Sequence, residues 1–154
     1  MYAIYLGIHS ITRYLVVLFL FGAILMSIHG YTQKKGFSNR HNAIRHWTAT
    51  IAHIQLIIGI LLYAQSPIAL YFIKNIGTAI KSTEMSFFGL YHSVAMLTAV
   101  VLITIGSALA KRREKDEEKF KTIVIWFGIA LLIIFIVIPW PFSPFVNRPY
   151  IRPF

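Results

Sequence analysis

Histidines inside apolar stretches are the residues of this sequence best suited to chemistry. His9, His53 and His92 each lie in a different long apolar stretch. Imidazole nitrogens bind haem iron, copper and zinc, and a polar ring within hydrocarbon is costly unless it has a partner. Three histidines on three predicted helices therefore indicate a cofactor or metal site. Separate hydrogen bonds between helices are the alternative explanation.

Four uncharged runs supply the elements that must position these histidines. Lys, Arg, Asp and Glu make up only 13% of the 154 residues, against about 25% in a typical soluble domain. The runs without them are 14–33, 46–73, 85–110 and 122–147. Each reaches the roughly 20 residues needed to cross a bilayer. We expect one all-α membrane domain, 1–154, a four-helix bundle with spans at about 3–29, 43–65, 85–110 and 122–139.

The basic residues predict how this bundle is oriented. Ten Lys and Arg residues lie in 30–45 and 111–121, and an even number of helices places both loops on one side. The other side has four, which are Lys74, Lys81, Arg148 and Arg152. Because basic loops stay in the cytoplasm, we expect a bacterial inner-membrane protein with both termini on the outer, periplasmic side. The net charge of +10 then favours anionic lipid, not nucleic acid, as partner.

Two segments on the outer side lie outside the predicted spans. Residues 68–81 are mostly apolar and carry two lysines seven residues apart, which predicts an amphipathic segment on the membrane surface. Residues 139–154 contain five of the six prolines and many aromatic residues, so a regular helix is not expected there. We expect this tail to lie along the outer interface or to dock on a partner.

Depth in the membrane decides which histidines can meet. At about 1.5 Å per residue, His9 and His92 both lie roughly 8–10 Å below the outer surface, and His53 lies about 6–9 Å deeper. The pair of equal depth is therefore His9 with His92. His53 with His92 requires helix tilt, of which about 20° is ordinary. His29 and His46 both lie near the inner surface and are candidates for a second haem.

Arg13 lies one helical turn from His9, on the same face of its helix. An arginine about two turns inside a membrane helix normally faces protein, water or an anion, so a haem propionate, another anion or a quinone oxygen is a candidate partner. Extension to the outer headgroups is the other explanation. The chain has no cysteine, and the predicted spans contain no carboxylate. These absences disfavour thiolate sites, non-haem iron and hydrolytic acid–base pairs.

Several motifs together resemble a known family. They are 9-HSITRY-14, 53-HIQLIIGILLY-63, 92-HSVAM-96, 104-TIGSALAKR-112 and 138-IPWPF-142. Over nearly the whole chain the sequence resembles the small four-helix "cytochrome b"-like membrane proteins of Bacteroidota. The resemblance implies b-type haem and membrane electron transfer, with His9, His53 and His92 as the characteristic histidines. Family members often have Glu-His-Pro where this chain has Tyr91, His92 and Ser93, a change that removes a carboxylate beside the histidine.

These observations predict a small membrane cytochrome, or the haem-bearing subunit of a redox complex, in which two histidines hold haem b. Other membrane subunits and quinol are the expected partners, and an electron carrier is favoured over a stand-alone enzyme. A haem-free accessory subunit of a larger membrane complex is the alternative. A metal-binding membrane protein with a three-histidine site is a third interpretation.

Overall fold

Four long helices account for most of the chain. The computed structural model describes residues 1–150, and this range contains helices, turns and loops but no strand. The four helices long and apolar enough to cross a membrane are α1 (Tyr2–Thr32), α2 (Asn39–Gln65), the continuous stretch Thr83–Arg112 and α7 (Asp116–Val137). The predicted four-helix membrane bundle is therefore confirmed, and the chain is a multi-pass membrane protein.

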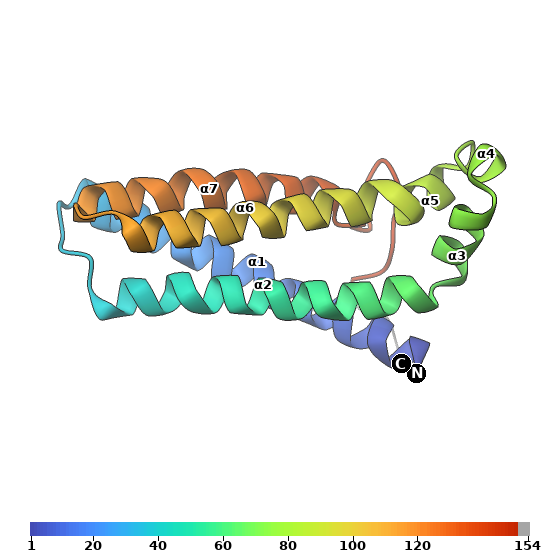
Figure 1. Cartoon of the computed structure of the whole chain (residues 1–154), viewed down its shortest axis with the longest axis horizontal. Helices are drawn as coiled ribbons and strands as arrows, with labels where there is room; N and C mark the ends of the chain where they lie inside the picture. Colours follow the sequence, from blue (N-terminus) through green and yellow to red (C-terminus); the bar gives the residue numbers. More distant parts are fainter. Residues whose placement is uncertain (151–154) are drawn as a thin grey trace.

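The four helices pack in a ring (Figure 1). Helix α1 lies against α2 and α7, and α6 (His92–Arg112) lies against α7 and, less extensively, against α2. The loops 33–38 and 113–115 lie at one end of the bundle, which we call the inner end. The N-terminus and the short helices α3 (Pro67–Lys74) and α4 (Ile76–Ala79) lie at the other, outer end. The basic loops thus share one end, as an even number of crossings requires.

Helices α2 and α7 both start at the inner end of the bundle, several residues before the expected spans. Helix α2 starts at Asn39, because Ser38 and His41 form a reciprocal cap in which the hydroxyl of Ser38 lies 2.8 Å from Nδ1 of His41. The expectation that His41 belongs to a loop is therefore wrong. Helix α7 starts at Asp116, and three acidic residues occupy its first turn. Carboxylates are stabilised at a helix N-terminus, so this charged run continues the helix.

The segment between α2 and α6 is broken into short helices. Ser66 caps α3 by accepting a hydrogen bond from the backbone N–H of Ala69 at 3.3 Å, and Pro67 occupies the first turn. Asn75 ends α3 and precedes α4. Two short helices thus stand where one amphipathic segment, 68–81, was expected. Phe72 is buried against Gly89 in a later helical segment, η1 (Phe87–Tyr91), so residues 67–79 also cover the outer end of the bundle.

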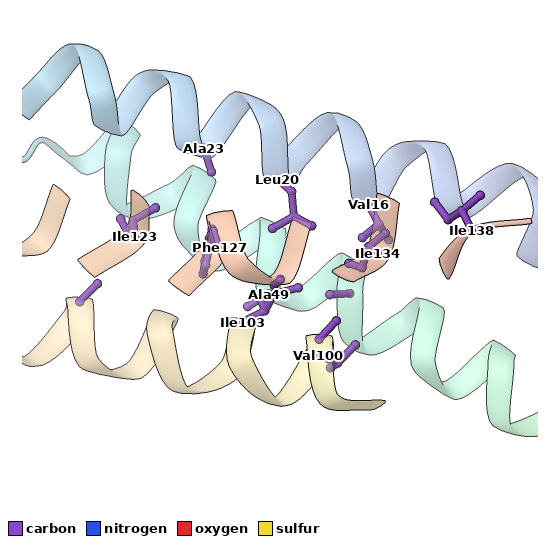
Figure 2. Close-up of a cluster of buried hydrophobic side chains, with 14 residues drawn as sticks. Val16, Leu20, Ala23, Ala49, Val100, Ile103, Ile123, Phe127, Ile134 and Ile138 are labelled. Atoms are coloured by element: carbon purple, nitrogen blue, oxygen red, sulfur yellow. The ribbon is translucent and has the colours of Figure 1, made fainter. Parts of the chain in front are cut away.

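A buried apolar cluster runs along the middle of the bundle (Figure 2). It joins Val16 and Leu20 of α1 to Ile103 of α6 and Phe127 of α7. Helices α6 and α7 approach so closely that a Cβ at Gly106 would overlap the side chain of Trp126. Small residues at such contacts are the usual means by which membrane helices pack tightly. Large apolar side chains such as Leu18 and Leu132 are exposed on the outside, as contact with lipid requires.

Arg45 is buried near the inner end of α2, although we counted it among the basic residues of the loop 30–45. Only 5% of its surface is exposed. Its guanidinium donates to the carbonyl of Ser107 at 3.0 Å, to the hydroxyl of Ser107, and twice to Oδ1 of Asn42 at 2.8 and 3.2 Å. Four hydrogen bonds thus replace the water that a loop arginine would have had.

Replacing Arg45 with methionine should lower the free energy of unfolding by about 2–3 kcal/mol, the scale of hydrogen bonds to a charged group. Methionine fills a similar volume but leaves the hydroxyl of Ser107 and the amide of Asn42 without their partner. Thermal unfolding in detergent measures the change. Arg40→Met is the matched control, because Arg40 is exposed at the same end of α2. Equal losses for the two variants would contradict a structural role for Arg45.

Candidate haem site between two histidines

The outer half of the bundle encloses a mostly apolar cavity. Its volume is about 370 Å³, within the range typical of small-molecule and cofactor sites. Side chains from α1, α2, α6, α7 and the tail after α7 line it, and the polar ones include His9, Arg13, Gln55, His92 and Arg148. The cavity therefore combines an apolar interior with a few convergent polar groups.

His9 and His92 face one another across this cavity from α1 and α6. Their ring centroids lie 6.4 Å apart, and the ring planes are inclined by 70°. Both side chains line the cavity wall. The structure thus brings together the two histidines that we expected at equal depth in the membrane.

A hydrogen bond at the end of α7 orients His92. Its Nδ1 lies 3.1 Å from the carbonyl oxygen of Val137, the last residue of α7. A carbonyl only accepts, so Nδ1 carries the proton and Nε2 keeps a free lone pair. A backbone carbonyl on one ring nitrogen is the usual support of a histidine that binds metal through the other. The carbonyl is free to do this because the last residues of a helix have no intrahelical donor.

His9 has no comparable anchor. Its Nδ1 is buried and has no hydrogen-bond partner among residues 1–150. The ring lies against Gly59 of α2, where an added Cβ would come within 3.3 Å of Cε1. A hydrogen bond between helices, the structural alternative for a buried histidine, therefore does not explain His9.

The side-chain amide of Gln55 hydrogen-bonds to α1 near His9, and both of its polar atoms are used there. Its Nε2 donates to the carbonyl of His9 at 3.0 Å, and its Oε1 accepts from the hydroxyl of Thr12. Both bonds join α1 to α2. Gln55 therefore holds the helix pair in register at the level of His9.

A π-helical segment, η1 (Phe87–Tyr91), leads directly into His92. The short helix α5 (Thr83–Ser86) precedes it. Two contacts fix η1: Gly89 lies so close to Phe72 that a Cβ would overlap it, and Tyr63 donates from its hydroxyl to the carbonyl of Gly89 at 2.7 Å. Such π-turns often occur at functional sites, where they rotate the residues that follow. No residue pattern in the sequence predicts η1, because its residues continue an ordinary apolar helix.

Arg13 binds the tail of its own chain. Its Nη2 donates to the carbonyl oxygen of Tyr150 at 2.6 Å, and the hydroxyl of Tyr14 donates to the same oxygen at 2.6 Å. The guanidinium also lies over the rings of Tyr14, at 4.9 Å, and Trp140, at 5.9 Å. Neither expected partner, a bound anion or the lipid headgroups, is needed to hold it. Up to Tyr150 the tail docks on its own bundle, and 151–154, with Arg152, lie outside the described residues.

A second ionic contact ties the tail to the start of the third span. Arg148 donates to the carboxylate of Glu84 in α5 and lies 5.0 Å over the ring of Phe88. Arg148 and Arg13 both line the cavity. Two arginines from distant parts of the chain thus line one cavity, and one of them is paired with a carboxylate.

His53 lies outside this cavity, on the exposed side of α2. Its Nε2 is 2.8 Å from the hydroxyl of Thr104 in α6. Within 1–150 no group of three or more His, Cys, Asp or Glu side chains is placed to hold a metal ion. The three-histidine site is therefore not formed. The candidates for a second haem do not line this cavity either: His29 is exposed beside Lys35, and His46 is exposed beside Trp47.

Comparisons of this chain with models of protein families, with curated proteins and with solved structures find no match.

Proposed function

We propose that this chain is a membrane b-type cytochrome, or the haem-bearing subunit of a redox complex, in which His9 and His92 hold one haem. The separation of the two rings carries the proposal. A nitrogen about 2 Å from a metal ion puts its ring centroid about 3.2 Å away, so two ligands on opposite sides of one ion lie about 6.3 Å apart. The observed separation is 6.4 Å.

Other features of the cavity support haem over a bare ion. Copper or zinc usually takes three or four ligands, and within residues 1–150 two histidines line the cavity. A flat apolar macrocycle instead needs an apolar chamber, which the cavity offers. Haem carboxylates would find positive charge where Arg13 and Arg148 line the wall. The resemblance to the "cytochrome b"-like family of Bacteroidota agrees with this reading.

The residues of the chain have distinct parts in this function. Haem supplies the one-electron chemistry. The carbonyl of Val137 binds Nδ1 of His92 and leaves Nε2 unbonded, Gly59 leaves room for the ring of His9, and the cavity walls are mostly apolar. Arg13, through its fixed positive charge, favours the reduced state, which carries one positive charge fewer.

The distribution of charge supports a location. Basic residues gather at the inner end, so that end faces the bacterial cytoplasm and both termini face the periplasm. Electron exchange would then occur within the inner membrane, with quinol or neighbouring subunits as partners.

A spectrum of the purified protein tests the proposal. Dithionite reduction in detergent should produce sharp α and Soret bands, and iron analysis should give one iron per chain. Absence of the bands, with helical circular dichroism intact and no bound metal, would contradict haem binding and favour the accessory-subunit alternative.

A further inference from the structure

The protonation of His53 follows from its partner on α6. The hydroxyl of Thr104 has one proton and donates it to the carbonyl of Val100 at 2.7 Å. The same oxygen lies 2.8 Å from Nε2 of His53, and we assign Nε2 as the donor in that contact because the carbonyl of Val100 can only accept. The proton of the neutral ring is then on Nε2, and Nδ1 is an acceptor. No residue within 1–150 donates to Nδ1.

This acceptor lies at a depth where water is scarce. His53 is twelve residues from Gln65 and fourteen from Asn39, about 18–21 Å from either end of α2. It is exposed on the outside of the bundle, next to exposed Ile54 and, one turn on, Ile57. Exposed polar groups are costly in hydrocarbon and usually mark a functional contact. The contact that suits Nδ1 is a hydrogen-bond donor that dissolves in the bilayer.

The position also adjoins the candidate haem cavity. Ala52, next to His53 in α2, and Val100, one turn from Thr104 in α6, both line the cavity wall. Helices α2 and α6 form the least extensive of the four contacts between neighbouring long helices. A donor bound at His53 would be separated from the cavity by little more than one layer of side chains.

We infer that His53 and Thr104 form a binding site for the ring of a quinol on the lipid-facing seam of α2 and α6. A quinol hydroxyl donates to Nδ1, and the apolar side chains around it contact the ring and its hydrocarbon tail. The oxidised quinone has no hydroxyl and cannot donate, so the site selects the reduced form. The role of this quinol as electron donor rests on the proposed function; its binding does not.

Photolabelling of the full chain in lipid nanodiscs tests the inference. The probe is a menaquinol analogue with a diazirine in its side chain, and mass spectrometry maps the labelled residues. We expect labels on α2 and α6 near His53 and Thr104, with stronger labelling by the quinol than by the matching quinone. His53→Leu should reduce the specific labelling about tenfold, the effect of one lost hydrogen bond. His46→Leu, the control on the same helix, should leave it unchanged.

A second variant checks the tautomer argument. Thr104→Val removes the acceptor that holds the proton on Nε2, so the preference for quinol over quinone should disappear. Unchanged labelling in His53→Leu would overturn the inference. So would a change in the oligomeric state of His53→Leu without loss of label, which would assign this face to a second copy of the chain. Labelling needs no haem, so specific labelling in a protein without haem bands would refute the proposed function alone.

Discussion

Replacing His92 with alanine should abolish haem binding, lowering the haem recovered per chain at least about tenfold, since even residues that only orient a ligand are worth 10–100-fold in metal affinity. The substitution removes a ring that lines the cavity and breaks its hydrogen bond to Val137. His9→Ala should also lower the haem recovered per chain, because it removes the second imidazole that lines the cavity. The pyridine haemochrome assay of purified variants measures the loss.

Two other histidines provide controls of different kinds. His41→Ala should keep its haem, because His41 lies at the inner end and caps α2. His53→Ala should also keep its haem, because His53 does not line the cavity. The second control distinguishes two assignments of the haem ligands. The geometry of the cavity assigns His9 and His92, whereas the family resemblance also includes His53. Loss of haem in His53→Ala together with retention in His9→Ala would contradict the assignment of ligands.

Replacing Gly106 with leucine should cause the largest loss of stability, at least about 3 kcal/mol, the upper range for overpacking a tight contact. Helix α6 packs on α7 more extensively than on any other element, and a Cβ at Gly106 would already overlap Trp126. The two helices would have to separate, and their core contacts, such as Ile103 with Phe127, would loosen. Thermal unfolding and size-exclusion chromatography in detergent measure the effect.

Gly128→Leu is the matched control, because it makes the same change on α7. A Cβ at Gly128 meets nothing within 4 Å, so the added side chain projects into open space. The unfolding temperature should then stay close to that of the parent protein. Similar losses for both variants would mean that the intrinsic helix preference of glycine, not the α6–α7 contact, determines the result.

The four spans and the proximity of His9 to His92 were predictable from the sequence. Both depend on distances along the membrane normal, which residue numbers give directly. Uncharged runs of sufficient length defined the four helices, and residue counting placed His9 and His92 at one depth. The ends of the helices were not predictable to the residue. Local caps at Ser38 and at the acidic first turn of α7 decided them.

Counting residues along a helix predicts how deep a side chain lies in the membrane, but it does not predict which way that side chain points around the helix axis. His53 lies near the depth of the cavity, yet α2 turns it toward the outside, and Gln55 faces α1 instead. The π-helical segment before His92 adds a further rotation that no residue type signalled. Burial of Arg45 against Ser107 and docking of the tail on Arg13 likewise depend on which faces meet in three dimensions.

Electron paramagnetic resonance of the oxidised protein tests most directly whether His9 and His92 hold one iron. Two imidazoles give low-spin ferric haem, and ring planes inclined by 70° predict a strongly anisotropic signal that integrates to one spin per chain. The signal should be absent in His9→Ala and in His92→Ala. A high-spin ferric signal in the parent protein, or a low-spin signal that survives either substitution, would contradict the account.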